Sequence, residues 1–383
     1  MMSNTATALA TSLQQIDKSD WPTYKFEDIA FNISERVEPQ ATNLDIYVGL
    51  EHLDSGDIHI RRKGTPADVK GTKLKVYKGD IIFGKRRAYQ RKAAIADFDG
   101  ICSAHAMVIR ANSETIDPQF LPFFLHSDAF MNRAVEISEG SLSPTIKWKI
   151  LKEQEFKLPP LHLQEIFSEV FRSTDEVIEK KKNLLVKYLQ LKSSYIKNAV
   201  FDVDHYKMVH LSDVAKFMNG FAFKPTDWGD SGYPIIRIQN LTDPSKPFNR
   251  TNRVVPEKYN ISKGDILASW SAVLDVFEWD SEPALLNQHI FKVNHDEKII
   301  LKPFFKYVLK ASIEQMLKYA HGTTMKHVVK KDFLDHKIPL PTLEEQNEII
   351  EILENIDQSV HAIRRNIDSS DKLISAFIKQ IVI

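Results

Sequence analysis

Two stretches of the sequence, GSLSPTIKWKILKEQEFKLPPLHLQEIF at 140–167 and GTTMKHVVKKDFLDHKIPLPTLEEQNEI at 322–349, decide the fold because they are copies of one another. A constant offset of 182 residues aligns them without a gap for 62 residues. Gln164 and Gln346 occupy the same place in the two copies, as do Pro159 and Pro341, and Gly140 and Gly322. Chance similarity seldom keeps one register for so long, so the chain contains an internal repeat.

The parts that precede these copies also correspond, although less closely. Lys78–Ile82 reads KGDII and Lys263–Leu267 reads KGDIL, at an offset of 185 residues. His105 falls opposite His289, and each leads into a short apolar run. The chain therefore consists of two halves, each a divergent globular region followed by a closely matched segment.

Each matched segment predicts a long helix that begins after a proline stop. Pro159 and Pro341 interrupt any preceding helix because proline lacks the N–H donor. A helix from Leu163 to Asn198 would be about 54 Å long at 1.5 Å per residue. In the first copy a seam with spacings of four and three passes through Leu163, Phe167, Val170, Thr174, Val177, Lys181, Leu184, Tyr188, Leu191 and Tyr195. In the second copy it includes Ile349, Ile352, Ile356, Ile363, Leu373 and Phe377, with Ser359, Asn366 and Ser370 as polar interruptions.

Heptad spacing of this kind is typical of a coiled coil, so the two seams are expected to pack on each other. The alternative is that each helix packs on its own globular region. Elsewhere, short apolar runs bounded by turn residues predict strands, and one apolar stretch in each half predicts a helix. The strands are expected at 46–50, 81–83, 107–109, 235–238, 266–268 and 290–293, and the helices at 120–125 and 304–309.

These patterns predict an α+β fold, in which two globular mixed domains related by the repeat are joined by two long helices that form an antiparallel coiled coil. The expected segments are an N-terminal stretch at 1–19, a first domain at 20–157, a first helical segment at 158–201, a second domain at 202–338 and a second helical segment at 339–383.

The composition excludes several classes of protein. The 383 residues include 51 basic and 51 acidic side chains, and 43% are apolar, so the chain is neither disordered nor of low complexity. No apolar run approaches the ~18–20 residues that span a bilayer, and the N-terminus is a poor secretion signal. The single cysteine, Cys102, excludes an internal disulfide and a cysteine-based zinc site. We expect a soluble cytoplasmic protein without a membrane partner.

The zero net charge conceals one strongly basic stretch. From Arg61 to Lys92 there are 12 basic residues and only two acidic ones. Within it, KRRAYQRK at 85–92 combines five cations with a tyrosine and a glutamine. A basic, partly aromatic loop favours nucleic-acid binding over a solvated surface without a partner.

Signatures of catalysis are absent or false. No G-x-G, H-E-x-x-H or G-x-S-x-G occurs. The sequence GDIIFGKR at 79–86 resembles a phosphate-binding loop, but Arg86 stands where a serine or threonine would bind magnesium. The sequence therefore predicts no catalytic residue, no cofactor site and no metal site in this chain.

The ordered motifs resemble the specificity subunit of Type I restriction–modification enzymes. The repeated elements are a glycine-led segment, a proline-punctuated stretch that ends in glutamine, and the long helix. The second half carries the closer match, with NGFAFK at 219–224, PIIRIQNL at 234–241, KGDIL at 263–267, NQH at 287–289 and IPLPTLEEQ at 338–346. In the first half, FNIS at 31–34 and SAH at 103–105 depart from that pattern.

The resemblance implies a subunit without catalysis. Each globular domain would be a target recognition domain that reads one half of a split sequence in double-stranded DNA. The two helices would form a spacer that fixes the half-site separation and docks two methyltransferase subunits, and through them the restriction and translocase subunits. S-adenosylmethionine, ATP and magnesium would belong to those partners.

The candidate residues fall into three groups. Arginine, lysine, asparagine and glutamine can read base edges, whereas scattered lysines can hold phosphates. Base readout is expected from Lys85, Arg86, Arg87, Tyr89, Gln90 and Arg91, and from Phe223, Lys224, Gln239, Asn240, Trp270 and Ser271, whereas Arg237 is either a reader or a buried structural cation. Phosphate contacts are expected from Lys147, Lys149, Lys326, Lys330 and Lys331, and partner contacts from Leu163, Gln164, Phe167, Leu343, Gln346 and Ile349.

Three other functions fit parts of the sequence. The chain could be the recognition subunit of a related Type II system, which the neighbouring genes would reveal. It could be a coiled-coil adaptor that does not bind DNA, although the basic loop at 85–92 argues against this. A divergent nuclease would need a carboxylate cluster with suitable spacing, and the sequence offers none.

Overall fold

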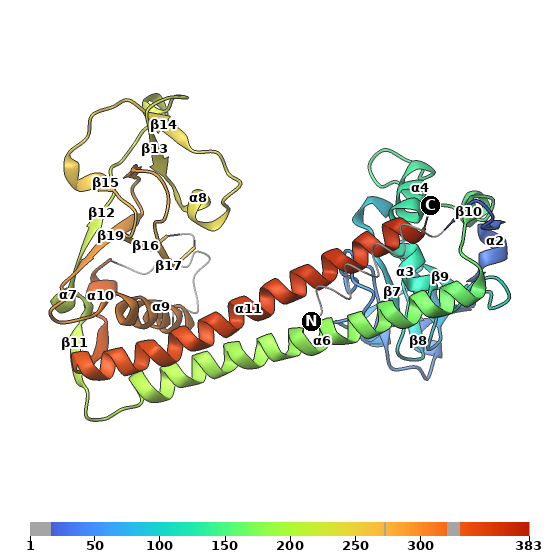
Figure 1. Cartoon of the computed structure of the whole chain (residues 1–383), viewed down its shortest axis with the longest axis horizontal. Helices are drawn as coiled ribbons and strands as arrows, with labels where there is room; N and C mark the ends of the chain where they lie inside the picture. Colours follow the sequence, from blue (N-terminus) through green and yellow to red (C-terminus); the bar gives the residue numbers. More distant parts are fainter. Residues whose placement is uncertain (1–16, 272, 320–329, 383) are drawn as a thin grey trace. The chain divides into compact units, whose positions relative to one another are not determined.

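The computed structural model describes residues 17–271, 273–319 and 330–382, which fold into two compact units. The first unit comprises the described residues up to Asn183 together with those from Arg364 onward, and the second extends from Leu184 to Ile363. Each unit contains one globular domain and parts of the two long helices (Figure 1). The α+β fold predicted from the sequence is confirmed.

The first domain contains two four-stranded sheets and a two-stranded ribbon. The main sheet is antiparallel and has the order β2 (Ala30–Ile33), β9 (Met107–Ala111), β6 (Ile81–Phe83), β7 (Ala93–Ile95). The second sheet has the order β3 (Arg36–Val37), β5 (Lys73–Val76), β8 (Gly100–Cys102), β4 (Tyr47–Val48), and β4 runs parallel to β8. The ribbon pairs β1 (Thr23–Lys25) with β10 (Glu155–Lys157). Short helices cover these strands: α2 (Phe26–Ile29), α3 (Leu121–His126), α4 (Asp128–Glu136) and α5 (Trp148–Leu151).

The second domain repeats the strand order of the main sheet, and its second sheet keeps the one parallel pair but differs in its edge strands. Its main sheet has the order β12 (Ala215–Asn219), β19 (Ile290–His295), β16 (Ile266–Ser269), β17 (Asp275–Glu278). Its second sheet has the order β14 (Asn249–Thr251), β13 (Tyr233–Ile236), β18 (Ala284–Leu286), β15 (Asn260–Ile261), with β13 parallel to β18. The ribbon pairs β11 (Lys207–His210) with β20 (Lys337–Leu340). The helices are α7 (Leu211–Val214), α8 (Ile238–Thr242), α9 (Lys302–Tyr319) and α10 (Lys330–Leu334). The repeat predicted from the sequence is thus a repeat of structure.

The two KGD motifs form the same turn at the start of β6 and β16. Gly79 and Gly264 have φ angles of 95° and 94°, a left-handed backbone that glycine adopts without a steric penalty. Asp80 and Asp265 each accept a hydrogen bond from the backbone N–H three residues earlier, at 3.0 and 2.7 Å. The motif therefore recurs because one glycine and one aspartate close the turn that aims each central strand.

The two long helices, α6 (Leu161–Ile196) and α11 (Leu343–Ile381), run antiparallel to each other within each unit (Figure 1). In the first unit, Phe171 of α6 and Phe377 of α11 belong to one hydrophobic core. In the second unit, Lys192 of α6 forms an ion pair with Asp357 of α11 at 2.6 Å. A π-helical turn, Lys197–Phe201, ends the first helix.

The predicted heptad seam is wrong in register over part of both helices. Leu184 and Leu191 of α6 are 43% and 53% exposed, and Ile352 of α11 is 42% exposed. The residues that α6 buries are Gln164, Phe167, Ser168, Phe171 and Ile178. Phe167 and Phe171 of α6 lie in the core of the first unit, and Ile349 and Leu353 of α11 lie in that of the second, so each helix packs on its own domain as well as on the other helix. The seam thus leaves an apolar stripe exposed.

Gln164 and Gln346 are buried at the first turns of the two helices, with exposed fractions of 1% and 0%. The side-chain amide of Gln164 donates to the carbonyls of Pro159 and Thr115 at 2.7 and 3.2 Å, and its oxygen accepts from the N–H of Asp117 at 3.0 Å.

Gln346 makes the equivalent set of bonds. Its amide donates to the carbonyls of Pro341 and Ile299 at 3.0 and 3.1 Å, and its oxygen accepts from the N–H of Leu301 at 2.8 Å. Each glutamine thus joins its proline stop to the loop that leads into the apolar helix of its domain.

The prediction that Gln164, Phe167, Gln346 and Ile349 contact a partner is wrong, because all four side chains are buried within their own units. Leu163 is half-buried and Leu343 is 39% exposed, so partner contact by these two remains a prediction. Among the described residues, no helix is both long and apolar enough to cross a membrane.

We expect Gln164→Ala to lower the free energy of unfolding by about 1–3 kcal/mol, because it leaves buried backbone groups without partners. The same loss is expected for Gln346→Ala in the second unit. Urea-induced unfolding followed by circular dichroism measures it. Glu165→Ala, at the exposed position next to Gln164, is the matched control and should change the free energy by less than about 0.5 kcal/mol. Equal effects of Gln164→Ala and Glu165→Ala would show that the buried bonds do not stabilise the helix start.

Candidate nucleic-acid interface

Three loops meet at one end of the first domain, which we call the first loop end: residues 49–51 after β4, 84–92 after β6 and 103–105 after β8. They line a shallow hollow whose polar side chains are predominantly basic. The lining residues are Leu50, Glu51, Arg86, Arg87, Gln90, Lys92, Ser103 and His105. The structure thus brings together most of the basic loop predicted to read DNA.

The basic loop is held in an unusual backbone conformation. Arg87 and Arg91 have φ angles of 58° and 50°, on either side of a single 3-10 turn at Ala88–Gln90. The N–H of Arg87 donates to the carbonyl of Pro144 at 2.7 Å, which ties the loop to the glycine-led segment of the repeat. Left-handed arginines cost free energy, and such strain collects at binding sites and active sites.

The ion pairs show which cations of the basic loop are free to bind a ligand and which are already paired with a carboxylate. Arg86 and Arg87 are exposed and have no acidic partner among the described residues, and Arg86 Nε donates to Ser143 Oγ at 2.7 Å. Arg91, in contrast, bonds Asp128 at 2.8 Å and the carbonyl of His126 at 3.2 Å. These bonds fix the loop to α4, and base readout by Arg91 stays a prediction.

The other predicted residues of this domain lie at or beside the first loop end. Tyr89 is 55% exposed, and Gln90 is half-buried. Lys85 is half-buried, and burial lowers the pKa of its ammonium group. It shares a second hollow with Arg36 and Lys147. Lys147 itself is exposed and forms an ion pair with Glu139 at 2.5 Å, and Lys149 is exposed.

The corresponding loops of the second domain also meet, and we call them the second loop end: Arg237 after β13, Trp270 and Ser271 after β16, and residues 287–289 after β18. Phe221 bridges to Asn287, and Trp270 Nε1 donates to Asn219 Oδ1 at 3.1 Å. The ring of Trp270 lies 5.0 Å from that of His289, an exposed residue with a φ angle of 72°. Trp270 follows its strand at the position that Lys85 occupies in the first domain, at the offset of 185 residues.

Two predicted readers of the second domain are structural. Phe223 is 7% exposed and packs edge-on against Phe221 with ring centroids 4.9 Å apart. Asn240 is 6% exposed, and its amide bonds the carbonyls of Lys246 and Pro247 at 3.2 Å each. The prediction that Phe223 and Asn240 contact bases is therefore wrong, because both side chains are buried within the domain.

The remaining predicted residues of the second half differ in exposure. Lys224, Gln239 and Lys331 are exposed, whereas Trp270 and Ser271 are half-buried. Lys326 lies outside the described residues, and Lys330 begins α10.

The sequence interpretation missed three residues of these surfaces: Arg36, His105 and Trp228. Arg36 lies in the hollow beside Lys85, His105 lines the first loop end, and Trp228 is 38% exposed beneath Arg237. The match between His105 and His289 was a signal in the sequence, but nothing local marked Arg36 or Trp228.

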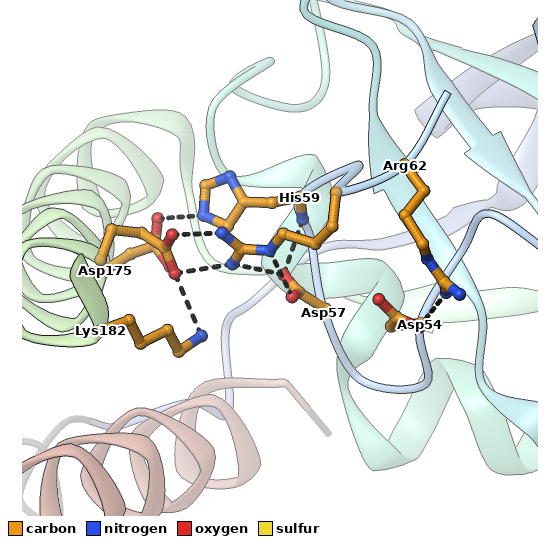
Figure 2. Close-up of polar contacts among 8 residues, drawn as sticks. Asp54, Asp57, His59, Arg62, Asp175 and Lys182 are labelled. Carbon is orange, nitrogen blue, oxygen red and sulfur yellow. Dashed lines mark hydrogen bonds and ion pairs between the residues drawn. The ribbon is translucent and has the colours of Figure 1, made fainter. Parts of the chain in front are cut away.

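A second polar cluster joins the first domain to α6 within the first unit (Figure 2). His59 Nε2 bonds Asp175 at 2.8 Å, and Arg61 bonds both Asp57 and Glu179. His59, Asp175 and Glu179 offer ligand atoms within 4.8 Å of one another, which is close enough to hold a metal ion. The Arg61 guanidinium lowers the pKa of the Glu179 carboxyl to about 2, so the cluster is built as a network of ion pairs.

Asp175 and Asp357 are equivalent residues of the repeat, and each anchors its helix with different partners. Asp175 meets a histidine, whereas Asp357 accepts from Lys192 at 2.6 Å and from the hydroxyl of Tyr307 at 2.8 Å. Burial and the bond to Asp357 raise the pKa of Tyr307. The first anchor therefore contains an imidazole, whereas the second is made by a lysine and a tyrosine.

The Type I restriction modification DNA specificity domain matches residues 18–188 and again residues 204–369. Each match contains one globular domain with its loop end and most of one long helix. The chain belongs to this family. As a specificity-domain protein it carries two copies of the domain, which accounts for the repeat found in the sequence and in the strand order.

Among characterised relatives, the chain is similar to the type I restriction enzyme EcoBI specificity subunit of Escherichia coli, with 27% identity over 176 residues. That alignment covers 45% of this chain and 37% of the relative. The chain is also similar to the type I restriction enzyme MjaVIII specificity subunit of Methanocaldococcus jannaschii, with 24% identity over 327 residues, which are 77% of this chain and 73% of the relative.

Two solved structures share the fold of this specificity-domain protein. One comes from work on complex assembly and conformational transition of the type I R-M system, with a TM-score of 0.61, 20% identity, and 94% and 97% of the two chains covered. The other is the Type-I restriction-modification system S subunit from M. genitalium, with a TM-score of 0.57, 15% identity, and 96% and 97% covered.

The hydrogen bond to Asp175 raises the pKa of His59 above its ordinary value of 6.5. The charged ring therefore stabilises the first unit fully below pH 6.5, and this contribution is lost as the pH rises through the raised pKa. NMR titration of 13C-labelled histidine rings measures the pKa. Asp175→Asn should lower it, whereas Asp357→Asn, at the equivalent position of the repeat, should leave it unchanged. A His59 pKa unaffected by Asp175→Asn would contradict the anchor.

Proposed function

We propose that this chain is the DNA sequence-recognition subunit of a type I restriction–modification complex. Each domain reads one half of a bipartite target in double-stranded DNA through its loop end, and the chain itself catalyses no reaction. The observation that carries the proposal is the repetition of one loop end in both domains of a specificity-domain protein, with different side chains at equivalent positions. One scaffold thereby presents two unlike surfaces, as two unlike half-sites require.

The charge at the first loop end suits DNA. Arg86 and Arg87 can donate to guanine O6 and N7 in the major groove, and Lys92 adds positive charge beside them. We also expect phosphate contacts from the exposed Lys149, and from Lys147 once it releases Glu139, which would give affinity without sequence information. The neutral net charge is compatible with this function because Arg86, Arg87 and Lys92 lie together in one hollow.

The long helices supply a surface for the proposed methyltransferase partners. Leu184 and Leu191 lie seven residues apart on one face of α6 and are both substantially exposed. Apolar side chains that a helix leaves uncovered in a repeating row are suited to docking another protein. Two methyltransferase subunits would bring S-adenosylmethionine, and the restriction and translocase subunits would bring ATP and magnesium. The complex would act in the cytoplasm, where host DNA is accessible.

The recognition function is tested by co-expressing the chain with the methyltransferase encoded beside it and mapping adenine methylation across the host genome. We expect a split motif with a fixed gap. Replacing Arg86 and Arg87 with alanine should relax or abolish one half-site, because each good arginine contact contributes about 1–3 kcal/mol of base discrimination. Arg62→Ala is the matched control, since Arg62 is exposed but paired with Asp54 at 2.5 Å. No methylation by a stable complex of the two wild-type proteins would instead favour an adaptor.

The docking surface is tested by replacing Leu184 and Leu191 with aspartate. The substitutions should weaken co-purification of the methyltransferase at least ten-fold while the chain keeps its circular dichroism spectrum, because both side chains are already exposed. Gln190→Asp adds a charge on the same helix without removing apolar surface and should leave the complex intact. Equal binding by all variants would place the partner elsewhere on the chain.

A further inference from the structure

The second domain contains three arginines, and two of them are neutralised by carboxylates. Arg250 Nη2 bonds Glu282 at 2.7 Å, and Arg253 Nη1 bonds Asp227 at 2.6 Å. The third, Arg237, has no ion pair and no side-chain hydrogen bond among the residues that the structure describes. Its positive charge is therefore available to a ligand.

Arg237 is held by an aromatic ring. Its guanidinium carbon lies 4.9 Å from the centroid of the Trp228 ring. A cation held over an aromatic ring by this contact uses no N–H hydrogen bond, so the N–H groups of Arg237 stay available to donate. The contact also restricts the side chain before any ligand arrives, which reduces the entropy lost on binding. Trp228 thus positions a two-pronged hydrogen-bond donor.

The backbone around Arg237 is fixed at the second loop end. Arg237 directly follows β13, and its own N–H donates to Asn240 Oδ1 at 3.2 Å. The carbonyl of the preceding residue, Ile236, accepts from the N–H of Asn287 at 3.2 Å. Residues 288 and 289, which follow Asn287, are exposed, and His289 contacts Trp270. Arg237 is therefore at the same end of the domain as the other loops proposed to meet DNA.

We propose that Arg237 is a specificity-determining residue that reads a guanine in the half-site bound by the second domain, with Trp228 as its positioning residue. This inference rests on the proposed function and adds a base identity to it. Guanine is the base that presents two acceptors, O6 and N7, side by side in the major groove, and an arginine fork matches them. Adenine offers a donor in place of one acceptor, so it would leave one prong of the fork facing another donor.

A phosphate contact is the competing use of an unpaired arginine, and it behaves differently. Loss of a base contact removes the preference for one base pair at one position, whereas loss of a phosphate contact weakens binding to every sequence and reduces its salt dependence. The structure favours the base because the Trp228 ring restrains the position of the guanidinium, and a restrained position matters for two parallel bonds to a base edge more than for attraction to a phosphate.

The experiment compares Arg237→Lys and Arg237→Ala with the matched control Arg250→Lys in the complex of the full chain and its methyltransferase. Lysine keeps the charge but loses the fork. Genome-wide methylation by the wild-type complex first defines the split motif. Dissociation constants are then measured on duplexes that carry each single base-pair substitution in the half-site that the Arg86 and Arg87 variant leaves unchanged.

We expect Arg237→Lys to weaken binding of the intact target by about 5- to 150-fold. Substituting one particular G·C pair should then cost the variant nothing more, because the contact to that pair is already lost. Trp228→Ala should produce a smaller loss at the same position. Arg250→Lys should keep wild-type affinity and the wild-type motif, since its charge already faces Glu282.

Two results would overturn the inference. One is that both Arg237 variants keep the wild-type discrimination at every position. The other is a uniform loss on all duplexes with a shallower salt dependence, which would make Arg237 a phosphate contact. A thermal melt of each variant separates these results from misfolding, and the charge-conserving Arg237→Lys provides a readout if Arg237→Ala is unstable. Failure of the wild-type complex to methylate a split motif would refute the proposed function and this assignment with it, whereas the two results above refute this assignment alone.

Discussion

A buried glutamine amide fixes each long helix to its own domain. Gln164 and Gln346 each satisfy two carbonyls and one N–H that would otherwise be buried without partners. The bonded groups come from the proline stop and from the loop before the apolar domain helix, so the amide sets where the long helix starts and where it points. The rest of the structural repeat depends on this junction, because the two long helices can occupy equivalent positions in the two units only if each helix starts in the same way.

The architecture could be predicted from the sequence because it depends on helix-stopping and turn-forming residues and on the periodicity of apolar residues. The prolines, the KGD turns and the apolar runs act locally, so their consequences can be read without knowing the tertiary contacts. Site residues depend on distant partners. Arg91 is neutralised by Asp128, and Asn240 is buried by a loop that folds back over it. No local pattern marks these contacts, and the left-handed φ of His289 is likewise invisible in the sequence.

The heptad seam shows that a correctly identified periodicity can still lead to a wrong prediction of which surface the apolar side chains contact. Its spacing is real, but Leu184 and Leu191 remain exposed because α6 also turns residues such as Phe167 and Phe171 toward its domain. The surface of a helix is limited, so its faces must be divided between contacts to the domain, to the second helix and to any further protein. Side chains that fit neither of the first two surfaces are those left for the third, which is why the stripe supports a docking role.

The distribution of ion pairs is informative about recognition for a physical reason. A side chain that must bind DNA cannot be fully satisfied by the protein alone, since breaking an internal ion pair would offset the gain from a new contact. Five of the eight arginines in the first domain have carboxylate partners, and those without one in the described chain are Arg36, Arg86 and Arg87. All three lie in or beside the first loop end, as Arg237 does in the second. Unpaired arginines therefore collect where strained or aromatic-supported loops hold them ready, and that coincidence links the local geometry to the reading of a split DNA target.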